Sequence, residues 1–167
     1  AIKECIEKTN INIEEIKKSD PNASCGLKVF MGASTGDLLV DKYESLEKIF
    51  EHCPTNIVTH CEDPKRLIEN ENIFQEKYGD QLHAAHHAVI RDEECCYLSS
   101  SLAVGLAKKF GANLHVLHLS TKREMDLFEP GPIDNKKITA EGCVHHLTFS
   151  DKDYEELGNF IVCNPSI

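Results

Sequence analysis

The stretch "DEECCYLSSSLAVGLAKKFGANLHVLHLST", residues 92–121, combines a helix pattern with the strand pattern that follows it. Acidic residues open the helix pattern, an apolar stripe continues it, and Lys108, Lys109 and Gly111 close it. Acids at the start and lysines at the end of a helix complement its dipole, and glycine is favoured just after the last turn. The apolar run 114–119 then has the length of a buried strand. The stretch therefore predicts a helix over 92–110 that leads directly into a strand.

The same alternation of short apolar runs and longer helical patterns extends in both directions. The other predicted strands are Leu27–Met31, Ile57–His60, Lys137–Cys143 and Asn159–Cys163, and the other predicted helices are 2–18, 43–52, 64–78 and 122–128. Strands that alternate with helices indicate right-handed βαβ units and a parallel sheet. The predicted fold class is α/β, and a doubly wound sheet and a barrel both fit the pattern. In both folds the functional groups lie at the carboxyl ends of the strands.

Composition narrows the function classes. The 167 residues are 41% hydrophobic and 28% charged, which suits one globular domain with a core of its own. The formal charge of −10 argues against a nucleic-acid partner, and no apolar run approaches the roughly 20 residues of a membrane span. The eight cysteines form no CxxC pair, several lie in apolar runs, and no secretory signal is recognisable. We therefore expect reduced thiols, a cytoplasmic location, and neither nucleic-acid nor membrane partners.

Three of the predicted strands carry a side chain suited to metal chemistry. Lys28 lies within an apolar run, where the loss of hydration lowers the pKa of an ammonium group. A neutral amine can add carbon dioxide and form a carbamate that bridges two metal ions. His60 ends its strand and His118 lies near the end of the next one, and neutral imidazole is a good zinc ligand. Any one of these residues alone is more simply a structural residue, but three in successive units indicate a shared metal site.

Strand alternation constrains the two histidines of "NLHVLHLST". His115 and His118 are three residues apart, so they face opposite sides of a regular strand and cannot both bind the same metal ion. On a regular strand His118 shares its face with Leu114 and Val116.

The last predicted unit adds weaker candidates. Glu141 shares a strand face with Thr139, and burying it without a partner would be costly, so we expect it to support a metal ligand. His145 and His146 are adjacent and are expected to point in different directions, which leaves at most one of them near the site.

Five blocks of the sequence, in this order, closely resemble the dihydroorotases of the metal-dependent amidohydrolase superfamily. They are "GLKVFMGASTGDLLVD", "THCED", "LHVLHLSTKRE", "ITAEGCVHHLTFSDKDY" and "NFIVCNPSI", and together they span residues 26–167. The resemblance implies that the chain is the central portion, about strands four to seven, of a (β/α)₈ TIM barrel. Such a barrel holds one or two zinc ions at the mouth formed by the carboxyl ends of its strands.

The resemblance also implies roles for individual residues. Lys28 corresponds to the carbamylated lysine that bridges the metals, and His60 and His118 correspond to the ligands that end the next two strands. Asn164, in "CNPSI", corresponds to a residue that approaches the substrate ring. Arg91, in "VIRDEE", is interpreted as a structural ion-pairing residue. Glu62 and Asp63 match the family pattern and are given no direct role.

Two features of the family are absent from the 167 residues. The first barrel strand of the family supplies an HxH metal pair followed by an arginine, and no HxH occurs here. The eighth strand supplies an aspartate that acts as general acid and base, and we expect it beyond Ile167, so the chain itself supplies no catalytic residue. Residues 1–167 are therefore expected to form one partial barrel domain, with weak or no catalysis when isolated.

The function that the resemblance implies is dihydroorotase activity in pyrimidine biosynthesis. This reaction is the reversible, zinc-dependent cyclisation of N-carbamoyl-L-aspartate to L-dihydroorotate. A related cyclic amidohydrolase acting on hydantoin, dihydropyrimidine or allantoin would keep the same ligands and is an alternative. A catalytically inactive dihydroorotase-like scaffold subunit is another. The expected partner is a small-molecule substrate, with a homodimer left open.

Overall fold

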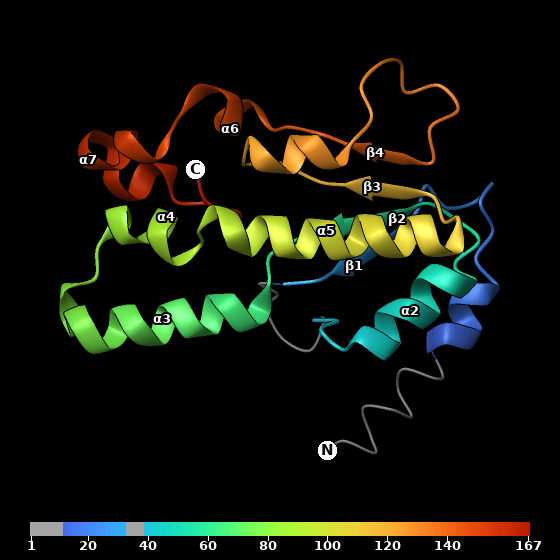
Figure 1. The fold of residues 1–167 in the computed structure, drawn as a ribbon, viewed down its shortest axis with the longest axis horizontal. Coiled ribbons are helices and arrows are strands. Elements are labelled where there is room, and N and C mark those ends of the chain that lie inside the picture. The colour runs from blue at the N-terminus through green and yellow to red at the C-terminus, as the bar shows by residue number, and fades with distance from the viewer. Residues whose placement is uncertain (1–11, 33–38) are drawn as a thin grey trace.

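A computed structural model of the chain describes residues 12–32 and 39–167, and these contain a four-stranded parallel sheet (Figure 1). The strands lie side by side in the order in which they occur in the sequence: β1 (Leu27–Phe30), β2 (Ile57–His60), β3 (Leu114–Val116) and β4 (Ile138–Ala140). Parallel strands in sequential order need a crossover between each pair, as the alternation predicted. The α/β class with βαβ units is confirmed.

Helices and short 3₁₀ turns connect the strands. The α-helices are α2 (Tyr43–His52), α3 (Pro64–Tyr78), α4 (His87–Ile90), α5 (Glu93–Phe110), α6 (Val144–Thr148) and α7 (Tyr154–Leu157), and residues 12–17 are also helical. The 3₁₀ turns are Gly79–Gln81, Ala84–His86, Arg123–Leu127, Asp151–Asp153 and Gly158–Ile161. The predictions for 43–52, 64–78 and 92–110 are therefore confirmed, and the helix predicted over 122–128 is a 3₁₀ turn. Of the helix predicted over 2–18, residues 2–11 lie outside the described residues.

The strand predicted over Asn159–Cys163 is wrong. Residues Gly158–Ile161 form a 3₁₀ turn, and Gly158 has a φ of 55°. A short apolar run does not by itself distinguish a strand from another buried segment. Here Ile161 is buried and Tyr154 donates a hydrogen bond to its carbonyl oxygen, so the segment packs as a turn against α7.

Both ends of α5 have the predicted caps. The Asp92 side chain accepts a hydrogen bond from the Cys95 amide at 3.0 Å, and Gly111 takes the left-handed conformation with a φ of 67°. A residue with a Cβ would be strained at that φ. The helix therefore stops just before β3 and directs the chain into the sheet.

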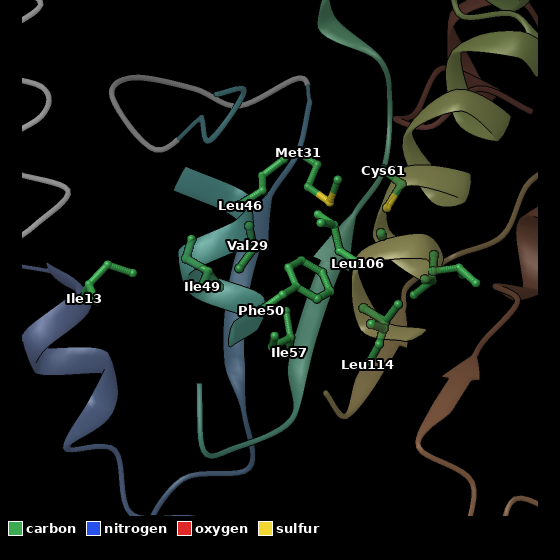
Figure 2. Close-up of a cluster of buried hydrophobic side chains, with 14 residues drawn as sticks. Ile13, Val29, Met31, Leu46, Ile49, Phe50, Ile57, Cys61, Leu106 and Leu114 are labelled. Atoms are coloured by element: carbon green, nitrogen blue, oxygen red, sulfur yellow. The ribbon is translucent and has the colours of Figure 1, made fainter. Parts of the chain in front are cut away.

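One face of the sheet is packed against α2 and α5, as Figure 2 shows. Ile57, Leu114 and Val116 of this face have no exposed surface. They pack with Leu46, Ile49 and Phe50 of α2 and with Ala103, Val104, Leu106 and Ala107 of α5. We call this side of the sheet the packed face.

The alternate strand residues form the opposite side, the polar face. The strand register aligns Lys28 with Val58, Val58 with His115, and His115 with Thr139, so all four side chains lie on this face. His60, two residues after Val58, belongs to the same face. The polar face therefore carries the chemistry-bearing residues of the strands.

Two composition-based expectations can be compared with the described residues. Their seven cysteines are all free, and Cys61, Cys95 and Cys96 are buried. None of the described helices has both the length and the apolar character needed to cross a membrane.

Candidate metal centre

The carboxyl end of β2 holds a buried network of three charged or titratable side chains. His60 is 5% exposed and its Nε2 lies 2.8 Å from Oε2 of Glu62, which has no exposed surface. Arg91 Nη1 donates to both carboxylate oxygens of Glu62 at 2.8 Å. Burial opposes the ionisation of Glu62, but the hydrogen bond from His60 and the charge of Arg91 outweigh it and hold its pKa below the ordinary value. Glu62 is thus a buried carboxylate with two donors.

A glycine at the end of β1 makes room for this network. A Cβ on Gly32 would lie 1.8 Å from the carbonyl oxygen of Glu62, a distance that no side chain can take. The backbone after β1 therefore packs directly against the backbone after β2. This close approach fixes the position from which Glu62 reaches His60.

His118 reaches the same point from the segment after β3. The strand ends at Val116, and His118 has a φ of 39°. Its Nε2 lies 3.1 Å from Nδ1 of His60, with the two rings nearly edge to face. The prediction that His118 shares a face with Leu114 and Val116 is wrong, because the positive φ rotates the chain out of strand alternation. His118 is consequently on the side of His60.

The contacts of His60 define which of its nitrogens can bind a metal ion. The ionised carboxylate of Glu62 only accepts hydrogen bonds, so the proton of His60 is on Nε2 and the Nδ1 lone pair is directed at His118. Two ligand nitrogens on a tetrahedral zinc ion stand about 3.3 Å apart, given bonds of roughly 2.0–2.1 Å. The observed 3.1 Å between His60 Nδ1 and His118 Nε2 therefore fits two ligands of one cation.

The environment of His118 keeps its imidazole neutral. Burial, followed by the neighbouring charge of His60, lowers the pKa of His118 to about 4. Its Nδ1 is buried, and among the described residues it has no hydrogen-bond partner. A neutral ring is the form that binds metal, so this ring fits the ligand role.

Lys28 lies on the polar face, on the strand next to that of His60. Its Nζ is 4.7 Å from the centre of the Phe30 ring, and that ring is 6.2 Å from the ring of His60. Partial burial lowers the pKa of Lys28, while the charges of Cys61 and Glu141 act in the opposite direction. The positive charge of Lys28 in turn helps to lower the pKa of His118. Of the three predicted ligands, His60 and His118 are therefore in direct contact, and Lys28 lies on the same face of the sheet as His60.

Comparison with known proteins finds relatives among dihydroorotases and allantoinases. No protein-family model matches the chain. A dihydroorotase from Methanosarcina mazei is 28% identical over 148 residues, covering 84% of this chain and 32% of the relative. An allantoinase from Bacillus velezensis is 26% identical and covers 92% of this chain and 34% of the relative. The chain is a homologue of dihydroorotases and allantoinases. The resemblance to the amidohydrolase superfamily is confirmed.

Solved structures show that this homologue shares the fold of hydantoinases. The L-hydantoinase (dihydropyrimidinase) from Arthrobacter aurescens superimposes with a TM-score of 0.78 at 21% identity, over 93% of this chain and 35% of that one. The D-hydantoinase (dihydropyrimidinase) from a Thermus species gives 0.77 at 17% identity, over 96% and 35%. These proteins are TIM barrels, and the expected fold, a portion of such a barrel, is confirmed. The chain spans about a third of the length of the relatives it matches.

Two further residues were predicted for the site, Glu141 from its position on the strand and Asn164 from the resemblance. Glu141 follows β4 and its Oε2 lies 3.3 Å from Nε2 of His115, whose Nδ1 is 2.9 Å from the hydroxyl of Thr139. Its direct contact is therefore with His115 and not with a predicted ligand. Asn164 is exposed in the segment after the last 3₁₀ turn. The supporting role of Glu141 and the substrate contact of Asn164 stay predictions.

Sequence reasoning missed one important residue, Glu62. The sequence did contain an indication of this role, because an acidic side chain two residues after a strand-end histidine can accept a hydrogen bond from that histidine. Arg91 was correctly interpreted as an ion-pairing residue, and its partner is Glu62. Asp63, next to Glu62, instead caps α3 by accepting a hydrogen bond from the Arg66 amide at 2.8 Å.

Proposed function

We propose that this chain contributes the metal-binding centre of a zinc-dependent cyclic amidohydrolase. The observation that carries the proposal is the 3.1 Å approach of His60 Nδ1 to His118 Nε2, with the other nitrogen of His60 held by Glu62. In this proposal Lys28, carbamylated, joins the two histidines as a ligand of one or two zinc ions. Bound zinc would polarise the carbonyl of a cyclic amide and lower the pKa of water at the site.

The side chains around the ligands have separate tasks in this proposal. Glu62 accepts a hydrogen bond from Nε2 of His60 and so fixes both the tautomer and the orientation of the ring. The hydrogen bond from His60 and the charge of Arg91 together hold the pKa of Glu62 below its ordinary value despite burial, so Glu62 stays ionised. Glu141 holds the neighbouring His115, and Asn164 would contact the ring of the substrate.

Dihydroorotate is the substrate we favour. The support is the likeness of "ITAEGCVHHLTF" and "CNPSI" to dihydroorotases, together with the dihydroorotase among the relatives. Allantoin, hydantoin and dihydropyrimidine are alternatives, which the allantoinase relatives and the hydantoinase folds support to a similar degree. Parallel assays of the protein with a complete barrel, on dihydroorotate, hydantoin, dihydrouracil and allantoin, test this choice. Preference for any substrate but dihydroorotate contradicts the specific assignment while keeping the general one.

Metal analysis of Lys28→Ala tests the centre directly. We expect the variant to lose bound zinc and to regain part of it when a short carboxylic acid replaces the carbamate. Lys137→Ala is the matched control, because Lys137 precedes β4 at the opposite end of the sheet and contacts the Gly111 carbonyl. Unchanged zinc content in Lys28→Ala would refute the carbamate assignment.

The proposal also specifies what lies outside the 167 residues. An HxH pair and an aspartate, expected from the first and eighth strands of a complete barrel, would come from other segments, and residues 1–167 alone would turn over substrate weakly or not at all. An inactive scaffold subunit is the rival, and loss of either element from the full gene would favour it. The free thiols of the described cysteines support a reducing compartment, the cytoplasm.

A further inference from the structure

Cys143, His145 and His146 lie together where β4 gives way to α6. Cys143 is the residue before the first turn of α6, and its carbonyl accepts a hydrogen bond from the Leu147 amide. The turn gathers the three side chains, and one potential ligand atom of each lies within 4.8 Å of the others. None of the three belongs to the centre formed by Lys28, His60 and His118.

His146 has one nitrogen engaged and one left over. Its Nε2 lies 3.1 Å from the carbonyl oxygen of Pro165. A carbonyl oxygen only accepts hydrogen bonds, so Nε2 carries the proton and Nδ1 keeps its lone pair. Nδ1 is buried, and within the described part of the chain it has no partner. An unpaired buried acceptor is costly, and a cation would remove that cost.

The protonation state of His146 suits a metal ligand. Burial lowers the pKa of His146, so the ring is neutral at physiological pH. Carbonyl groups commonly hold the second nitrogen of a metal-bound histidine in this way and fix its orientation. Pro165 therefore acts as the orienting group for His146.

His145 and Cys143 supply the other two potential ligands, which are less enclosed than a core residue. The rings of His145 and His146 have centres 4.3 Å apart, and His145 is exposed. His145 also borders a cavity of about 140 Å³, so its ring has room to turn. Cys143 is a free, half-buried thiol. Ligand atoms on a tetrahedral zinc ion stand about 3.5 Å apart. The three atoms here lie within 4.8 Å of one another, so closing the site requires a shift of about 1 Å by His145 and Cys143.

A second thiol near His146 is not part of this set. Cys163 Sγ lies 3.9 Å from Nε2 of His146, which is the protonated nitrogen, and 3.2 Å from the Pro165 carbonyl oxygen. It is thus on the side of the ring opposite to the free lone pair.

We propose that Cys143, His145 and His146 form a second cation site, for a borderline-soft divalent metal of the zinc class. One thiolate and two imidazoles match the preference of zinc, whereas magnesium and calcium prefer oxygen ligands. Three protein ligands leave a fourth position for water. Binding ties the start of α6 to the segment after β4 and, through the Pro165 carbonyl, to the last residues of the chain.

Cobalt substitution separates this site from the first centre. The purified protein is freed of metal and titrated with Co²⁺, and the near-ultraviolet band of sulfur-to-cobalt charge transfer is followed. Lys28, His60 and His118 contain no sulfur, so that band reports only a cysteine ligand. We expect the band in the parent protein and its loss in Cys143→Ser. Cys53→Ser, which removes another half-buried free thiol that lies after α2, should keep the band.

His145→Ala provides a second variant that is expected to fold, since the side chain is exposed. It should weaken Co²⁺ binding at the sulfur-containing site by more than about tenfold, because even outer partners of metal ligands contribute that much. A band that persists in Cys143→Ser, or one that disappears in Cys163→Ser instead, would overturn the proposal. Either result leaves the Lys28 centre untouched, and failure of that centre would leave this band in place.

Discussion

The packed face and the polar face of the sheet are made from alternate residues of the same strands, yet different interactions stabilise them. On the packed face, which α2 and α5 cover (Figures 1 and 2), Ile57, Leu114 and Val116 are fully buried. On the polar face, Lys28 is exposed and His115 is half-buried at the same level of the sheet. One face is stabilised by the removal of apolar surface from water, and the other by individual polar contacts.

The difference between the faces indicates that stability depends mainly on the packed face and the proposed metal binding on the polar face. Substitutions on the packed face should reduce packing and stability, whereas substitutions on the polar face should remove individual hydrogen bonds or ligands. Glu62 is the exception, because it is fully buried and also holds His60. Variants that affect one property without the other therefore test the separation.

Arg91→Met should have the largest effect, because it leaves the carboxylate of Glu62 buried without its cation. We expect the free energy of unfolding to fall by about 3–5 kcal/mol, measured by urea denaturation. Arg66→Met is the matched control, since Arg66 pairs with Asp92 near the surface and should contribute less than about 1 kcal/mol. Equal losses in the two variants would show that burial of Glu62 is not what matters.

Leu114→Ala and His115→Ala compare the faces on adjacent residues of β3. Loss of the fully buried leucine should lower the free energy of unfolding by about 2–5 kcal/mol. Loss of the histidine removes contacts with Thr139 and Glu141 and should cost only about 1 kcal/mol. Urea midpoints at unchanged slope measure both, and a larger loss for His115→Ala would reverse the assignment of the faces.

Acidification should destabilise the metal-free protein through His118. Its pKa is about 4 in the folded protein and about 6.5 when unfolded, so between these values the unfolded chain binds a proton that the folded chain does not. Stability is then complete above about pH 6.5 and falls on the order of 2 kcal/mol as the pH drops to about 4, allowing for partial exposure. Glu62 adds a further loss only at lower pH, since its folded pKa is below the ordinary carboxyl value.

Denaturation curves at several pH values, with chelator present, measure this dependence. In His118→Gln the loss between about pH 6.5 and 4 should shrink. A variant with the same pH dependence as the parent would assign the proton uptake to another group.

Asp63→Ala should have the smallest effect and the most local one. Removing the cap of α3 should cost about 1 kcal/mol of stability and leave the zinc affinity unchanged. Glu62→Gln, one residue earlier, should instead weaken zinc binding about 10–100-fold, because a neutral amide replaces the carboxylate that orients the ring of His60. Equilibrium dialysis with zinc distinguishes the two, and similar affinities would contradict the role given to Glu62.

Local sequence patterns were sufficient for most of the secondary structure. Dipole-matched charges and a closing glycine placed α5, and the helix predicted over 64–78 coincides with α3. They were insufficient for the run Asn159–Cys163, where an apolar composition did not reveal a 3₁₀ turn. The charge of Glu62 was visible in the sequence, but its partner Arg91, 29 residues later, was not predictable from spacing.

By itself the sequence determined that Lys28 and His60 lie on strands of a parallel sheet, because propensity and periodicity act over neighbouring residues. Only the tertiary structure decided that His118 faces His60. Strand alternation would have placed it on the packed face, and the positive φ after Val116 is what turns it back. The burial of Glu62 was likewise decided in three dimensions, by the close approach of Gly32 and the cation of Arg91. Such contacts join residues far apart in the chain, and no local pattern encodes them.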